Sequence, residues 1–560
     1  MPREQALALL QDYLDHAFPL LPIIHSTTTR TIVSEFYDQL SRGGHVRPQV
    51  AALILCISAV SAWLWQPDAG RHARFASVRE ATQLWEIWRK WSFEILTRTQ
   101  ASDGSTLEGA QTWALLSYAT LNAEGGSAYF RFLHYTAITA ARELSMHLVD
   151  SPKADRSEDR VTREVKRRLW WHLAVTDWML GSVGGPYEGT YSIQPRHMNV
   201  RYPRNLNDND VATWDDSMTA PLNVPTQMSF VLQRIRIGEI VRTTLDARPP
   251  GSPDVDMPDD YNTVVALDRL FEQAFMDMPP FFQIPSPFQP EKLDSFQLQG
   301  AILQLCLLSR RARLHRPFFL QQHISANPRH QPSRDICLQC SRKSVCISVG
   351  ILEASLDAAR RSDTGSEPRQ IEKMRPRSGL SAHRLGHIIN HMFVACTVLA
   401  FYAGASSGPD NSPARRQLGD SGAEEPDRTA VHAELTNACR VLAALGAESP
   451  VAARLLRNLV SLLRRYQVQG VDGDEMLERL EGKERKETTG KGAAGHGHSQ
   501  TFGETEVLSD VDGGLAPVAG PGDAHVDFDG LWDEFMGSSD DYTQLFADLD
   551  YHCGMGVNVA

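Results

Sequence analysis

Three cysteines offer the most obvious spacing for metal chemistry. Cys337, Cys340 and Cys346 form the pattern C-x2-C-x5-C, and a structural zinc site is built from four such thiolate or imidazole ligands. No second half of a zinc site follows, and Cys337 and Cys340 lie one turn apart in a segment whose apolar spacing predicts one continuous helix. We therefore predict that they are small buried helix residues, and we expect no metal site and no cofactor in this chain.

Residues that could serve in catalysis do not form a complete site. Ser406 lies in the sequence Gly-Ala-Ser-Ser-Gly, but a nucleophile elbow needs a strand before it and a helix after it, whereas this motif follows a predicted helix and enters a Gly/Ser/Pro-rich stretch. A D-D-x-x-D metal motif is not completed at the paired aspartates, which are Asp215 and Asp216, Asp259 and Asp260, and Asp540 and Asp541. His496 and His498 are too few for a site. The sequence predicts that the protein is not an enzyme.

The elements that must position any functional side chain are helices. Apolar residues recur every three or four positions, while alternation with a period of two is scarce. The run Val50–Trp65 is shorter than the roughly 18 to 20 residues needed to cross a bilayer, so we expect a buried helix and no membrane partner. An all-α fold is predicted, with helices at 163–181, 228–245, 261–276, 292–314, 334–359, 383–402 and 430–467 and with one long irregular stretch at 181–215.

Composition divides the chain into a body and a tail. Residues 501–560 contain no lysine or arginine, and the whole chain has a net charge of -12. The body is close to neutral, which argues against broad electrostatic capture of nucleic acid. We predict a helical domain at 1–480 with a mobile insertion at about 403–428, a flexible linker at 481–525 and an acidic, aromatic segment at 526–560.

The terminal segment has the composition of an acidic activation segment. Its carboxylates repel one another and keep its bulky apolar side chains available to a partner's groove. We expect transcriptional coactivators to bind it. The candidate contacts are Trp532, Phe535, Tyr542, Leu545, Phe546 and Leu549.

One predicted helix combines tryptophans with charged residues. In the sequence EVKRRLWWHLAVTD at 164–177, Trp170 and Trp171 follow the basic pair Arg167 and Arg168, and Asp177 shares a helical face with Trp170. We interpret this segment as a core helix whose arginine and aspartate side chains form buried or rim ion pairs.

This helix resembles the signature of the fungal-specific transcription factor domain, the middle homology region of fungal zinc-cluster regulators. Residues 9–25, the loop 184–210, and the segment RRARLHRPFFL at 310–320 resemble other parts of the domain in the expected order. The last of these carries the Leu-His-Arg-Pro helix end with His315, Arg316 and Pro317. The resemblance implies an all-α, non-catalytic regulatory domain in a nuclear protein.

The zinc cluster of that family is not found in this sequence. The family carries six cysteines upstream of the homology region, where two zinc ions hold a short helix for the major groove, whereas here the homology region starts almost at Met1. We expect this polypeptide to bind DNA weakly and without sequence preference. Zinc and sequence-specific DNA binding would require a missing zinc-cluster segment or a partner regulator.

The resemblance and the tail together predict a fungal transcriptional regulator, an activator of a pathway-specific gene set such as a biosynthetic gene cluster. Partners would be coactivators, a second copy or a related regulator in a homo- or heterodimer, and an unknown small-molecule effector. One alternative is a modulator of such regulators that lacks its own DNA binding. A weaker alternative is a helical ligand-binding protein or enzyme.

Overall fold

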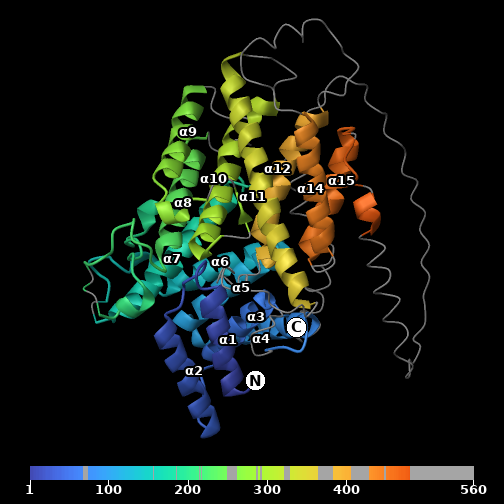
Figure 1. Ribbon diagram of the computed structural model, residues 1–560. Coiled ribbons are helices and arrows are strands. Elements are labelled where there is room, and N and C mark those ends of the chain that lie inside the picture. The colour runs from blue at the N-terminus through green and yellow to red at the C-terminus, as the bar shows by residue number, and fades with distance from the viewer. Residues whose placement is uncertain are drawn as a thin grey trace, which may run out of the picture.

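The computed structural model describes residues 1–66, 74–155, 157–183, 186–213, 215, 217–248, 261–284, 288–290, 293–320, 328–363, 382–404, 428–446, 449–468, 470–473 and 475–479. The described residues form α-helices and short 3-10 turns, with no strand among them (Figure 1). The predicted all-α fold is therefore confirmed. The linker and the acidic segment lie outside the described residues.

The first group of helices surrounds an apolar central helix. It consists of α1 (Arg3–His16), α2 (Ser26–Ser41), α3 (Pro48–Leu64), α4 (Val78–Asp103), α5 (Leu107–Glu124) and α6 (Ala128–Glu143). Helix α3, which includes most of the apolar run, is buried along nearly its whole length and packs on α1, α4 and α5. The side chains of Ser77, Thr106 and Ser127 cap α4, α5 and α6 by accepting backbone N–H groups of the first turn.

Helix α7 (Arg160–Gly181) connects the two groups of helices. It begins at the N-cap Asp159, whose carboxylate accepts the N–H of Thr162, and it packs on α5 and α6 on one side and on α8 (Ser229–Asp246) on the other. A long irregular segment leads from α7 to α8 and contains the 3-10 turns Pro195–His197 and Asp208–Asp210. The signature helix is therefore central to the body.

The second group consists of α8, α9 (Tyr261–Met276), α10 (Ser295–Leu320), α11 (Gln331–Asp363), α12 (Gly386–Gly404), α14 (Arg428–Gly446) and α15 (Pro450–Arg465). In Figure 1 these helices stand side by side above the first group, with α5, α6 and α7 in the zone between them. Helix α12 packs on α10, α11, α14 and α15, and also reaches α5. The two groups of helices therefore meet along α5, α7, α8 and α12.

Two predicted helix boundaries were wrong. The predicted single helix at 430–467 is two helices, because Ser449 accepts the N–H of Ala452 as an N-cap and Pro450 occupies the first turn of α15. The predicted helix at 292–314 extends to Leu320, so Pro317 lies inside α10 and the Leu-His-Arg-Pro motif does not end the helix. A proline removes one backbone donor, but in the last turn of α10 Phe318 packs against Tyr261 of α9 and Phe319 packs against Phe401 of α12.

Helix α12 is the one described helix that is long and apolar enough to cross a membrane. Its 19 residues include a window with a mean hydropathy of 1.4, long and apolar enough to cross a membrane, but 67% of that window is buried. The surrounding helices α10, α11, α14 and α15 account for this burial. We interpret α12 as a core helix.

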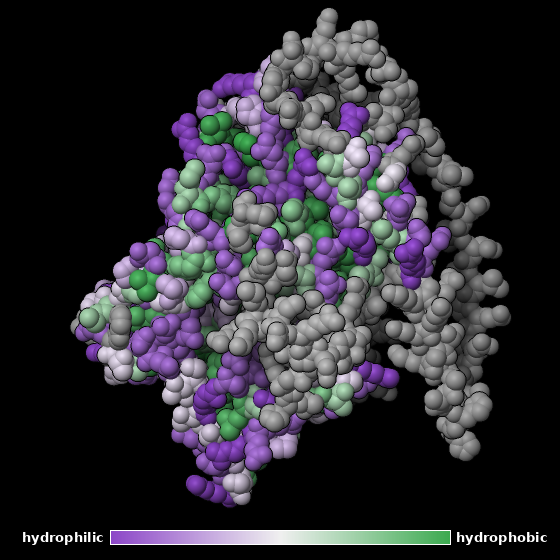
Figure 2. Space-filling view, in the orientation of Figure 1, coloured by the Kyte–Doolittle hydropathy of each residue, from purple (hydrophilic) through white to green (hydrophobic). Residues whose placement is uncertain are grey.

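The visible surface of the body is mainly hydrophilic, with smaller hydrophobic areas between (Figure 2). Among the exposed large apolar side chains, Ile87 and Trp91 lie on α4 and Phe132 lies on α6. Several groups of polar side chains are instead buried between helices, where burial without a partner is costly. These interior groups are therefore candidates for a functional site.

Candidate functional site

The basic pair of the signature helix forms buried ion pairs. Arg167 donates to both carboxylate oxygens of Asp150 at 2.9 and 2.6 Å and to Glu164 at 3.1 Å. Arg168 donates to Asp208 at 2.7 Å, and both side chains of this pair are at most 3% exposed. A charge this far from water is stable only when it is paired and hydrogen-bonded. The two arginines therefore hold the segment before α7 and the loop after it against the helix.

Asp208 extends this cluster to the start of α2. Its carboxylate accepts the N–H of Ser26, and its carbonyl oxygen lies 3.0 Å from Nε2 of His25. Burial by itself raises the pKa of Asp208, but the Arg168 charge and the Ser26 hydrogen bond outweigh burial and lower the pKa below its usual value. Asp208 is therefore a buried carboxylate that stays charged.

The tryptophans and the aspartate of the signature helix fix the loop that follows it. Trp171 donates its indole N–H to the carbonyl of Arg201 at 2.8 Å. One oxygen of Asp177 accepts the N–H groups of Ser192 and Ile193 at 2.8 and 2.7 Å. Trp170 is 1% exposed and faces the sulfur of Met198 at 3.5 Å. These contacts give the signature residues a structural role at the junction of helix and loop.

The second set of signature residues connects α9, α10 and α11. His315 on α10 lies 2.9 Å from Asp268 on α9 and 2.8 Å from the hydroxyl of Ser333 on α11. Arg311 donates twice to the same carboxylate at 2.6 and 2.8 Å. Arg316 is also buried, and Pro317 follows it within α10. A histidine between a carboxylate and a serine has the composition of a catalytic triad, but the serine here lies in a helix and is 0% exposed.

A third interior group was not predicted from the sequence. It lies where α6, α7, α8, α10 and α12 meet, and we call it the central basic cluster. Its members are His134, His172, Arg234, Arg310, His387 and His391.

Two close helix approaches bring these side chains together. A Cβ on Gly238 would lie 2.9 Å from Val175, so glycine allows α8 to approach α7 closely near Arg234 and His172. A Cβ on Gly386 would lie 2.3 Å from the carbonyl oxygen of Asn122, so α12 starts against α5. The side chain of Asn122 lies 2.9 Å from Nδ1 of His387. Glycine thus sets the spacing of the helices around the cluster.

The histidines of the cluster are neutral at physiological pH. Burial, together with the charge of Arg234, lowers the pKa of His134 to about 3 and that of His387 to about 4. Burial and neighbouring positive charges also hold the pKa values of His172 and His391 well below the usual value. At pH 7 the positive charge of the cluster is therefore carried by its arginines.

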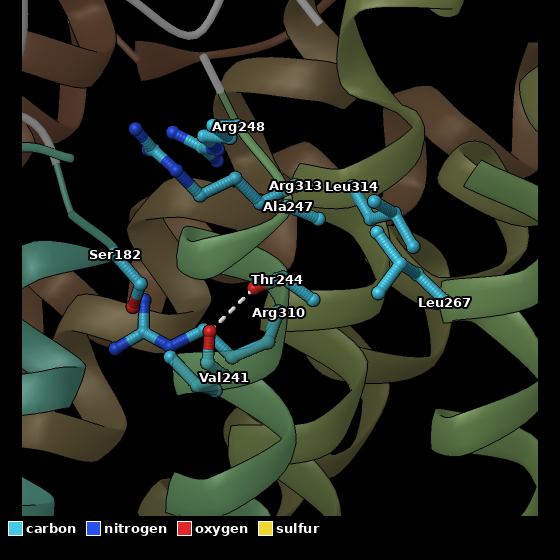
Figure 3. Close-up of a pocket in the computed structure, with 9 residues that line it drawn as sticks. All are labelled: Ser182, Val241, Thr244, Ala247, Arg248, Leu267, Arg310, Arg313 and Leu314. Atoms are coloured by element: carbon cyan, nitrogen blue, oxygen red, sulfur yellow. Dashed lines mark hydrogen bonds between the residues drawn. The ribbon is translucent and has the colours of Figure 1, made fainter. Parts of the chain in front are cut away.

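A surface pocket adjoins one side of the cluster (Figure 3). It is lined by the end of α7 and by residues of α8, α9 and α10, including Ser182, Arg248, Arg310 and Arg313. In Figure 3 Arg310 extends toward Ser182, while Arg248 and Arg313 lie together at another side of the pocket. Glu188 pairs with Arg313 and lies 3.8 Å from Arg248. Arg310 thus contributes to both the pocket and the central basic cluster.

The three cysteines lie on one continuous helix, α11, as predicted. Cys337 and Cys340 are buried and Cys346 is exposed. Burial raises the pKa of Cys340 to about 11, so its thiol is protonated at pH 7. No group of three or more His, Cys, Asp or Glu side chains that could hold a metal occurs within the described part of the chain.

The remaining sequence candidates lie elsewhere. Ser406, the histidines 496 and 498 and the candidate activation contacts Trp532, Phe535, Tyr542, Leu545, Phe546 and Leu549 fall outside the described residues. The central basic cluster could not be predicted from the sequence, because its members come from separate helices. Its one local signal is the pair His387 and His391, one turn apart on an otherwise apolar helix.

Known proteins resemble the chain along most of its length. Residues 10–271 match the family described as Fungal specific transcription factor domain. The chain is 36% identical to "Transcription factor TAS2" of Pyricularia oryzae over 99% of this chain and 74% of that protein. It is 34% identical to "Probable transcription factor lepB" of Aspergillus flavus over 84% of this chain and 78% of that protein.

The name of a third relative refers to a biosynthesis cluster. The chain is 29% identical to "Agnestins biosynthesis cluster transcription factor AgnL11" of Paecilomyces divaricatus, over 61% of this chain and 50% of that protein. These similarities agree with the resemblance carried by the signature helix and its loop. The chain belongs to the fungal transcription factors that contain the fungal specific transcription factor domain.

Proposed function

We propose that the chain is a nuclear activator that controls the genes of one pathway, such as a biosynthetic gene cluster. The observation that carries this proposal is the similarity over nearly the whole chain to fungal transcription factors, together with a relative named for a biosynthesis cluster. The acidic, aromatic composition of 526–560 supports activation rather than repression.

The helical body would act as the regulatory part. Its two groups of helices meet around α7, and the central basic cluster lies at this junction. The segment 526–560 would recruit coactivators, with Trp532, Phe535 and Phe546 as anchors for an apolar groove. A few bulky anchors supply most of the binding energy in such interfaces.

Sequence-specific DNA binding would come from a zinc-cluster segment outside this sequence or from a partner regulator. Residues 1–560 contain neither a six-cysteine module nor a compact basic arm. A homodimer or a heterodimer with a related regulator would place two such modules on adjacent half-sites.

Transcript profiling of the source fungus tests this proposal. The gene is deleted in one strain and overexpressed in another, and transcripts are compared with the parent strain. We expect one restricted group of genes to fall in the deletion strain and to rise on overexpression. Unchanged transcripts would contradict a regulatory function, and a rise of the same genes on deletion would contradict activation.

A further inference from the structure

The central basic cluster contains buried positive charge without negative charge. Arg234 donates to the hydroxyl of Thr176 at 2.8 Å and approaches Nδ1 of His172 at 3.5 Å, and both partners are neutral. Arg310 lies near Cys306 and Arg313, and its Nε has no hydrogen-bond partner. No described carboxylate pairs with either arginine. The signature arginines Arg167 and Arg168, by contrast, each contact a carboxylate.

Several further polar atoms in the same place lack partners. His134 is 0% exposed, and neither of its ring nitrogens has a hydrogen-bond partner. Nε2 of His387 and Oδ1 of Asn390 are also buried without a partner. Native proteins satisfy most buried polar atoms. A concentration of unsatisfied atoms around two unpaired arginines therefore indicates that a bound molecule completes the hydrogen bonding.

Four side chains of the central basic cluster are partly accessible. Arg234, Arg310, His387 and His391 are neither fully buried nor exposed, so a water-sized sphere still reaches part of each side chain. Burial nevertheless lowers the pKa of each of these groups. The pocket beside Ser182 adjoins the cluster, because Arg310 belongs to both (Figure 3).

We propose that the central basic cluster binds a small organic anion, with the guanidinium groups of Arg234 and Arg310 paired with its carboxylate. Guanidinium is suited to this role because its planar fork of N–H donors matches a carboxylate. The neutral histidines donate or accept hydrogen bonds without adding charge. The sulfur atoms of Cys306 and Met179, 4.0 Å apart, offer apolar contact beside Arg234.

Binding would join the two groups of helices. His134 and His172 come from α6 and α7, whereas Arg234, Arg310 and His387 come from α8, α10 and α12. An anion between them would bridge both sides and stabilise one arrangement of the body. Control of transcription by this anion rests on the proposed function, whereas anion binding itself does not.

Thermal unfolding of the purified full chain tests the site with matched probes. Acetate, benzoate and salicylate are each compared with acetamide, benzamide and salicylamide, and sodium chloride keeps the ionic strength equal. The variants are Arg234→Gln and Arg310→Gln, and the control is Arg236→Gln on the same helix, which removes a half-exposed pair with Asp277. Circular dichroism at low temperature checks that each variant is folded.

We expect at least one carboxylate, and not its amide, to raise the unfolding midpoint of the wild type and of Arg236→Gln by several degrees. The rise should disappear in Arg234→Gln and in Arg310→Gln. If one variant fails to fold, the other decides the outcome. Equal shifts with acid and amide, a shift that persists in the folded variants, or no shift with any probe would overturn the proposal. Because the readout is binding, a negative result leaves the transcript experiment unaffected.

Discussion

Arg168 and Asp208 form an ion pair 2.7 Å long between helix α7 and the loop that follows it, and both side chains are at most 3% exposed. The same carboxylate holds the first N–H of α2 through Ser26. Three segments that are far apart in the sequence therefore depend on one buried charge pair.

Replacing Asp208 by asparagine should destabilise the body strongly. The change leaves Arg168 with a weaker partner at this position, and breaking a buried pair in this way costs about 3 to 5 kcal/mol. Chemical denaturation followed by circular dichroism measures the loss. The matched control is Asp38→Asn, because Asp38 pairs with Arg3 at the surface, where both side chains are more than 40% exposed and such pairs contribute about 0 to 1 kcal/mol. Equal losses in the two variants would contradict the structural role of Asp208.

The tryptophans of the signature helix should be needed for folding and not for a separate activity. Trp170 and Trp171 are 1% and 5% exposed, and truncation of each to alanine should cost about 3 to 5 kcal/mol. The double variant should therefore be largely unfolded by circular dichroism, because a domain's whole stability is only about 5 to 15 kcal/mol. Trp91→Ala is the control, since Trp91 is 51% exposed. A well-folded double variant that has lost activity would instead identify a ligand or partner site.

The Asp268 carboxylate should make stability depend on acid pH. Burial by itself raises the pKa of Asp268, but hydrogen bonds and charges from His315 and Arg311 lower it to about 2. The unfolded value is about 3.9. Because the folded pKa is depressed, the stabilisation is present above about pH 4 and is lost as the pH falls toward 2, with a magnitude of about 1 to 2 kcal/mol.

Unfolding free energy measured from pH 6 to pH 3 checks this dependence. Asp268→Asn cannot titrate at this position, so its stability should fall less steeply below pH 4 than that of the wild type. Identical slopes in the two proteins would show that the carboxylate does not gain its charge stabilisation from His315 and Arg311.

The α11 cysteines should not bind zinc. Cys337 and Cys340 are buried with raised pKa values, and a thiol must lose its proton to coordinate zinc. Zinc titration should leave the unfolding midpoint of the wild type and of the Cys337→Ala/Cys340→Ala variant equally unaffected. In the folded protein a thiol reagent should modify Cys346 faster than the other two. A zinc-dependent rise in the midpoint that the double variant loses would contradict this prediction.

The sequence predicted the elements better than the contacts. The spacing of apolar residues around Trp170 and Asp177 was enough to predict helix α7 and a shared face. It could not predict that Asp208 would be the partner of Arg168, because that pairing depends on the path of an irregular loop. The helix end expected at Pro317 was wrong, because packing of the following phenylalanines on α9 and α12 outweighs the loss of one backbone hydrogen bond.

The central basic cluster could not be predicted from the sequence for a similar reason. Arg234 and Arg236 are two residues apart on one helix, yet Arg234 faces the interior without a carboxylate and Arg236 pairs with Asp277 at the surface. The helical period separates the two faces, but only the neighbouring helices determine which charges meet there. By contrast, the role of 526–560 is predicted from composition alone, because acidic and aromatic residues are interleaved within this one short segment.

The central claim, a regulatory body joined to an activation segment, is tested most directly by a reporter assay. The full chain is fused to an unrelated DNA-binding domain and compared with two variants of equal expression. One variant replaces Trp532, Phe535 and Phe546 by alanine, and the other replaces Asp533, Asp540 and Asp548 by asparagine. We expect the parent to activate the reporter, the aromatic variant to lose activation, and the charge variant to be only weakened, because bulky anchors supply most of the interface energy while charges mainly change encounter rates. Activation by the aromatic variant equal to that of the parent would contradict the account.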